Sequence, residues 1–162
     1  MPAAPAPRPE PASPSAQASL SAPRAIRTLP SWLLGRAAAR GRGLVAEALA
    51  AEGIKMWHHV VLSAVCDLGP VAQAALGRSI QLDPKDLVGV LNDLQTAGLV
   101  VREPDPKDRR KNAVSLTEEG GRLLKRCEKA ARAANEALLS SLSTAEREQF
   151  MDLLIRISGT DG

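Results

Sequence analysis

Residues 101–120, VREPDPKDRRKNAVSLTEEG, decide how the chain folds. Apolar, strand-like stretches flank Asp105–Asn112, a run that contains four cations, two anions and no apolar residue. A helix-start pattern follows at once, with Thr117 as a candidate N-cap and two glutamates behind it. The stretch therefore predicts a two-stranded β-ribbon, Leu99–Arg102 paired with Ala113–Leu116, that carries a charged tip and leads into a long helix.

Helical patterns fill the chain on both sides of this ribbon. Ser31 is a candidate N-cap for the first helix, and Asp83 is placed to cap a helix that has Pro84 at its first position. The run Ser143-Thr-Ala-Glu146 is a capping box that opens the last helix. The expected helices cover residues 31–52, 54–67, 72–78, 84–97, 117–142 and 143–158, and the ribbon tip covers residues 103–112.

Composition favours packed helices over a large sheet. The chain has 162 residues, a net charge of +3 and three aromatic residues, so Leu, Val, Ile and Ala must form most of the core. Eight of the twelve prolines fall within residues 1–30, which predicts a disordered Pro/Ala-rich tail ahead of one domain at residues 31–162. The expected fold class is mainly α with a small β-ribbon.

Several classes of protein lack the residues they would need here. There is no glycine-rich phosphate loop, no recognisable Ser/His/Asp arrangement and no metal-ligand spacing, so we expect neither an enzyme nor a bound cofactor or metal. No apolar run approaches the roughly 18–20 residues of a membrane span. Cys66 and Cys127 are far apart in sequence and are expected to be buried free thiols in a reducing cytoplasm, with a redox-sensing thiol as the alternative.

The order of these elements predicts a winged helix-turn-helix at residues 54–116, flanked by long helices at 31–53 and 117–158. The apolar faces of the outer helices are too extensive for the small middle part to cover alone. These helices must therefore pack on each other or on another subunit.

The chain resembles the MarR family of bacterial transcription regulators. The most specific part is the spacing Asp108-x-Arg110, then Leu116-Thr117, then Gly120. GPVAQAALGRSIQLDPKDLVGVLNDLQ is similar to the helix-turn-helix of that family, and LSTAEREQFMDLLIRI is similar to its C-terminal helix. The resemblance spans residues 31–158 and leaves the tail uncovered.

The resemblance implies a cytoplasmic, nucleoid-associated homodimer formed by the first and last helices of both chains. It also implies binding to a pseudo-palindromic DNA operator, usually as a repressor. In many members of the family a small aromatic or phenolic ligand relieves the repression. Two alternatives remain open: a winged-helix protein that acts through protein contacts, and a regulator that senses oxidation through a cysteine.

Residues expected to contact DNA fall into three groups. At the ribbon tip, Arg110 matches the family position that enters the minor groove, and Asp108 matches the acid that orients it. Phosphate contacts are expected from the other tip cations, Lys107, Arg109 and Lys111, and from the short helix and the turn after it, through Gln73, Arg78 and Ser79. For each residue of the short helix and turn, plain surface exposure is the alternative.

The helix at residues 84–97 is expected to lie in the major groove. Its outward residues are Lys85, Asp86, Val88, Gly89, Asn92 and Asp93. Lys85, Val88 and Gly89 are the predicted DNA contacts, whereas the two aspartates can instead be a helix-start charge and a surface anion. Because this surface has few hydrogen-bond donors, the ribbon tip and DNA shape are expected to supply more of the affinity than usual.

A second concentration of functional side chains lies around His58 and His59. In the family the helix at residues 54–67 lines the ligand pocket, so Trp32, Arg36, Trp57, His58 and His59 are candidates to hold a planar anion. Packing in the core or at an interface is the alternative for each of them. Neighbouring residues on a helix point about 100° apart, so the two histidines are not expected to bind one metal ion.

Overall fold

The computed structural model describes residues 23–104 and 112–159. The chain divides into two units, Met1–Ala39 and Arg40–Gly162. The first unit contains α2 (Arg24–Arg27) and the beginning of α3 (Pro30–Ala51), which continues into the second unit. Helix α2 lies within residues 1–30, the range predicted to be a Pro/Ala-rich tail. Ser31 was expected to cap α3 but lies inside it, because Pro30, whose fixed φ suits a first helical turn, starts the helix.

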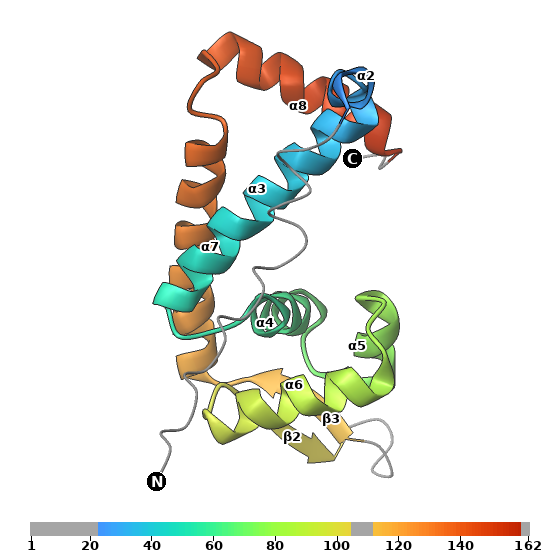
Figure 1. The fold of residues 1–162 in the computed structure, drawn as a ribbon. Coiled ribbons are helices and arrows are strands. Elements are labelled where there is room, and N and C mark those ends of the chain that lie inside the picture. The colour runs from blue at the N-terminus through green and yellow to red at the C-terminus, as the bar shows by residue number, and fades with distance from the viewer. Residues whose placement is uncertain (1–22, 105–111, 160–162) are drawn as a thin grey trace, which may run out of the picture. The chain divides into compact units, whose positions relative to one another are not determined.

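The second unit contains the winged helix-turn-helix and the C-terminal helices (Figure 1). After the end of α3, its elements are α4 (Met56–Leu68), β1 (Val71–Ala72), α5 (Gln73–Ser79), α6 (Pro84–Thr96), β2 (Val100–Pro104), β3 (Asn112–Leu116), α7 (Glu118–Leu138) and α8 (Thr144–Ser158). This order confirms the predicted fold class, which is mainly helical with a small sheet.

The sheet has three antiparallel strands in the order β1-β3-β2. Val100 pairs with Leu116 and Pro104 pairs with Asn112, so the ribbon extends further toward the tip than the sequence predicted. Strand β1 was not predicted. Two residues are too short to show a strand period, and β1 forms because Val71 pairs with Val114 across the sheet.

The hydrophobic core of the second unit lies around α4. Sixteen buried residues form one cluster, and α4 packs on α5, α6, α7 and β3. The fully buried residues of this cluster include Leu49, Leu62, Leu76, Leu87, Leu91 and Cys127. The expectation of two buried cysteines is half wrong, because Cys66 on α4 is exposed. Burial raises the pKa of the Cys127 thiol, the nearby Glu52 carboxylate adds to this rise, and a protonated thiol reacts poorly with oxidants.

Thr117 joins three elements at the base of the ribbon. Its hydroxyl accepts a hydrogen bond from Gly120 N–H at 3.0 Å, which confirms it as the N-cap of α7, and donates to the Gly98 carbonyl at 2.7 Å. Its backbone N–H donates to Leu99 O at 3.1 Å. Gly98 itself has a φ of +71°, which glycine adopts without strain, and the chain can therefore leave α6 and enter β2. The end of α6 and the start of α7 are thus held together.

The last helix, α8, begins with the predicted capping box between Ser143 and Glu146. None of its residues is buried within the chain. Four of its apolar side chains are substantially exposed: Met151 at 44%, Leu153 at 44%, Ile155 at 43% and Ile157 at 68%. Phe150 and Leu154 on the same helix are half-buried, so its apolar side chains are only partly covered.

Candidate nucleic-acid interface

Helices α5 and α6 form the helix-turn-helix, and α6 carries the exposed face. Asp83 caps α6 by accepting a hydrogen bond from Lys85 N–H at 2.8 Å. Leu87, Leu91 and Leu94 are buried, so the opposite face must point to solvent. Every residue predicted to point outward is exposed: Lys85, Asp86, Val88, Gly89, Asn92 and Asp93.

Two of these outward residues are held by neighbouring elements, which was not predicted. Arg102 on β2 donates from Nη2 to Asn92 Oδ1 at 2.9 Å. His58 on α4 contacts Asp93, with 3.3 Å between Nε2 and Oδ2. The His58 ring also accepts a hydrogen bond from Lys55 N–H at Nδ1, so Nε2 is the nitrogen that carries the proton toward Asp93. These pairings join residues distant in sequence, and the pattern of one helix contains no signal for them.

Helices α5 and α6 approach each other closely beside a groove of about 520 Å³. Gly77 permits the approach, because a Cβ there would lie 3.2 Å from Leu87 Cδ2. Gln73 and Arg78, both predicted phosphate contacts, line this groove. Ser79, the third, already donates its hydroxyl proton to Leu76 O at 2.8 Å, so in this conformation it has no donor to offer a phosphate.

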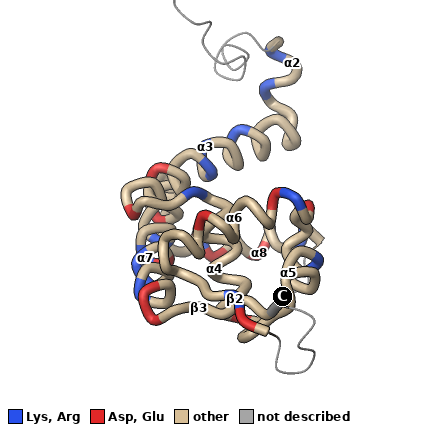
Figure 2. The backbone as a smooth tube through the Cα atoms, turned by 90° about the horizontal axis from the view of Figure 1, so that it is seen from below, with Lys and Arg blue, Asp and Glu red and all other residues tan. Residues whose placement is uncertain are grey.

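The predicted contacts at the ribbon tip, Lys107, Asp108, Arg109, Arg110 and Lys111, lie outside the described residues. On the rest of the unit the charges are mixed. Figure 2 shows Lys and Arg interspersed with Glu along α7, whereas α5 has Arg78 as its one charged residue. The described part of α6 has Lys85 as a cation but Asp86 and Asp93 as anions.

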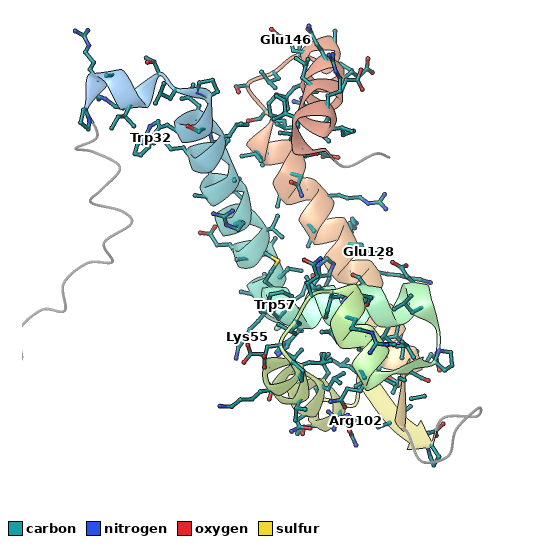
Figure 3. All side chains as sticks on the ribbon, turned by 90° about the vertical axis from the view of Figure 1, so that its right-hand side faces the viewer. Trp32, Lys55, Trp57, Arg102, Glu128 and Glu146 are labelled. Atoms are coloured by element: carbon teal, nitrogen blue, oxygen red, sulfur yellow. The ribbon has the colours of Figure 1, made fainter. Side chains whose placement is uncertain are left out.

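The five candidate ligand residues do not form one site within the second unit. Trp32 and Arg36 lie on the part of α3 that belongs to the first unit. Trp57 is 45% exposed, and His58 points toward Asp93 on α6. Figure 3 shows Trp57 and Lys55 at the start of α4. Successive residues of a helix point about 100° apart, so the side chains of Trp57, His58 and His59 point in different directions.

Of the five candidates, His59 lines a groove formed by described residues of the second unit. This groove has a volume of about 420 Å³ and is lined by His59, Val60, Ser63, Ala64, Asp67, Leu68, Ser79 and Ile80. The Nε2 atom of His59 is buried and has no hydrogen-bond partner among the described residues. Burial lowers the pKa of His59, against a smaller opposing effect of Glu128, so the ring is neutral at pH 7. The groove thus places the polar side chains of Ser63 and Asp67 in the same lining as His59.

Within the described ranges, no three metal-ligating side chains gather at one place. None of the helices at residues 23–104 and 112–159 is long and apolar enough to cross a membrane.

Comparison with known proteins agrees with this architecture. Residues 52–111 match the MarR family profile. The transcriptional repressor Rv2887 of Mycobacterium tuberculosis is 30% identical over 130 residues, which cover 80% of this chain and 93% of the relative. The chain belongs to the MarR family.

A solved structure of Rv2887 in a complex with DNA is similar to this MarR-family chain, with a TM-score of 0.70, 28% identity and coverage of 80% of this chain and 98% of that one. The structure of CouR from Rhodococcus jostii, bound to p-coumaroyl-CoA, has a TM-score of 0.69 and 30% identity and covers 86% of this chain and 99% of that one. The repressor NicR of Pseudomonas putida is 37% identical over 63% of this chain, and the match spans 65% of NicR. The predicted family is therefore confirmed.

Proposed function

We propose that this MarR-family chain is a transcriptional repressor that binds operator DNA as a homodimer and is released by a small ligand. The observation that supports it most directly is the exposed face of α6, presented by a buried leucine stripe in a winged helix-turn-helix. Rv2887, which shares this fold, has been solved in a complex with DNA. The relatives named above are transcriptional regulators, not enzymes.

In this proposal α6 enters the major groove. Lys85 donates to guanine or to a phosphate, Val88 contacts a thymine methyl group, and Gly89 allows the helix to approach the base edges closely. Arg78 and Gln73 meet the DNA backbone from the groove beside α5. The anions Asp86 and Asp93 oppose phosphate binding, so most of the electrostatic attraction must come from elsewhere.

The ribbon tip supplies that attraction. Lys107, Arg109 and Lys111 neutralise phosphates, and Arg110 enters the minor groove with Asp108 as its orienting acid. A narrow minor groove concentrates negative potential, so an arginine there gains more than it would from an exposed phosphate.

Dimerisation uses α8. Its exposed apolar side chains find no cover within the described part of their own chain, and a second copy supplies the complementary apolar surface. Two copies of α6 then face two half-sites of a pseudo-palindromic operator.

The effector is proposed to be a small aromatic or phenolic acid, or a conjugate of one. CouR, which resembles this chain, was solved with p-coumaroyl-CoA. The groove lined by His59 is the place in the second unit where a buried ring nitrogen, unpaired among the described residues, can bond to a ligand donor or acceptor. Trp32, Arg36, Trp57 and His58 remain proposed contributors.

Selection from a random duplex DNA library tests the function even though the operator sequence is not known. The parent protein should enrich a pseudo-palindromic sequence. Arg110→Ala should bind that sequence at least about tenfold more weakly and still form the same oligomer, because in this proposal the arginine contacts DNA and takes no part in the subunit interface. The recovered site should then be titrated with a panel of aromatic acids.

Each outcome of this test has a definite meaning. Failure of the parent to enrich any sequence would refute DNA recognition and favour a protein that acts through protein contacts. Equal binding by Arg110→Ala would refute the role of the ribbon tip and leave the helix-turn-helix as the reader.

A further inference from the structure

The polar surface where α6 meets β2 has a groove of about 440 Å³ lined by Asn92, Gln95, Thr96 and Arg102. None of these residues was among the predicted DNA contacts. Asn92 belongs to the outward stripe of α6, since Lys85, Val88 and Asn92 are spaced by three and four residues. The groove therefore continues the surface proposed to face the major groove. Arg102 lies in the middle of β2, opposite Val114, and Figure 3 shows it beside α6.

The chemistry of the contact determines how the Asn92 amide is oriented. A guanidinium has only donors, so the atom of Asn92 that faces Arg102 must be the oxygen. The distance from Nη2 to Oδ1 is 2.9 Å, an ordinary hydrogen bond. The amide nitrogen of Asn92 must then point away from Arg102, and its two N–H groups remain for an outside partner because the residue is exposed.

Arg102 is well placed to hold this orientation. The Arg102 side chain is half-buried and its Nε atom is enclosed by neighbouring atoms, so the guanidinium is packed at one end while Nη2 reaches Asn92. It lies beside the C-terminal half of α6, where the partial negative charge of the helix end favours a cation and disfavours an anion. The site is thus better suited to positioning a side chain than to binding a phosphate at the guanidinium.

We propose that Arg102 is a positioning residue that turns the Asn92 amide oxygen inward, so that Asn92 meets DNA as a hydrogen-bond donor only. A freely rotating asparagine can bind adenine through N6 and N7 together, which requires an outward oxygen. The held Asn92 instead selects an acceptor, either on a base edge such as guanine O6 or thymine O4, or on a phosphate oxygen. This inference rests on the proposed function, because it assigns a role within DNA recognition.

The first test replaces the donor while it keeps the contact with Arg102. Asn92→Asp retains an oxygen toward the guanidinium and makes that bond charge-assisted, so its melting temperature should equal or exceed that of the parent. Its affinity for the selected DNA should fall about tenfold or more, because the outward donor is gone. Gln95→Glu is the matched control, since it adds the same charge to the same groove and leaves Asn92 intact.

The second test asks whether Arg102 acts through Asn92. Arg102→Ala frees the amide and should change the base preferred at one position of the selected sites. The same substitution should have no such effect in an Asn92→Ala background. Arg102→Lys should restore the parent preference, because an ammonium also donates to Oδ1. A merely structural arginine would make Arg102→Ala equally damaging in both backgrounds, which would overturn the proposal.

The readouts also identify the acceptor and separate the two proposals. If Arg102→Ala changes the preferred base, the acceptor is on a base edge. If Arg102→Ala weakens binding to all sequences equally, and this effect disappears in the Asn92→Ala background, the acceptor is a phosphate oxygen. If the parent selects a sequence and Asn92→Asp binds it as well as Gln95→Glu does, the proposal that Asn92 donates to DNA is wrong, but the proposed function stands. If the parent selects no sequence, both are wrong.

Discussion

At Gly120, the first turn of α7 passes against the backbone of the residue that precedes β2. A Cβ at this position would lie 2.0 Å from the Leu99 carbonyl oxygen, which is itself fixed by a hydrogen bond from Thr117 N–H. Backbone cannot move aside as a flexible side chain can. The glycine is therefore required by close packing, although its φ is helical.

Gly120→Ala should lower the free energy of unfolding by at least about 2 kcal/mol, because the added methyl group forces α7 away from the ribbon. Gly121→Ala is the matched control, since a Cβ there meets nothing within 4 Å. That substitution should stabilise the helix by up to about 1 kcal/mol. Urea unfolding of both variants at one protein concentration measures the difference, and equal stabilities would contradict the packing argument.

The burial of His59 leads to a prediction about how the free energy of unfolding depends on pH. Burial lowers its pKa from the ordinary 6.5, so the unfolded chain binds more protons than the folded chain as the pH falls through that value. The free energy of unfolding should therefore decrease on acidification from about pH 7.5 to about pH 5.5. His59→Gln should remove part of this dependence, and urea titrations across the pH range would show the shallower slope. An unchanged slope would mean that His59 is readily protonated in the folded chain.

Residue-level prediction from the sequence worked where the reason was local. The outward set on α6 was correct, because a leucine stripe determines which side of a helix is buried. Two contacts were not predicted: Arg102 with Asn92, and His58 with Asp93. Each of them depends on how separate elements pack against one another. Ser79 was predicted as a phosphate contact because its type and position fit that role, but in the folded chain its hydroxyl bonds to Leu76 O.

Among the elements, helix starts were the most predictable features. Asp83, Thr117 and Ser143 all cap as expected, because each is a short polar residue directly ahead of an apolar helical pattern. Ser31 has the same character but follows a proline that begins the helix itself. The strand β1 escaped prediction because its two residues become a strand only by pairing with β3.

The cap of α6 should be measurable on its own. Asp83→Ala should reduce the free energy of unfolding by about 1 kcal/mol, since it removes the acceptor for Lys85 N–H. Asp83→Asn keeps an acceptor of the same shape and should stay within a few tenths of a kcal/mol of the parent. Chemical unfolding followed by circular dichroism compares the three proteins. A loss of the same size in Asp83→Asn would show that the charge matters and not the cap.

For the whole molecule, the exposed apolar face of α8 is the feature that requires an explanation. The sequence indicated that the outer helices need another surface, and Ile157 remains 68% exposed within the chain. No part of the sequence pattern could distinguish a partner helix of the same chain from that of a second copy, because both offer the same apolar stripe.

If α8 forms the proposed dimer interface, Ile157→Lys should shift the protein from dimer to monomer, because an ammonium buried in that interface would have no partner. Leu68→Lys is a matched control, since Leu68 is 50% exposed on α4, away from α8 in sequence. That variant should retain the oligomeric state of the parent. Sedimentation equilibrium distinguishes the two states, and an unchanged mass for Ile157→Lys would exclude this face as the dimer contact.

The junction at Thr117 gives α7 the properties of a lever. One end of α7 is fastened to the end of α6 through Gly98, and the other end leads into α8. Its 21 residues span about 32 Å at 1.5 Å per residue. In a dimer joined through α8, a tilt of about 10° would displace each α6 by about 5.5 Å, more than the 3.4 Å rise of a base pair. A ligand that changes this angle slightly would therefore put the two reading helices out of phase with the turn of the double helix.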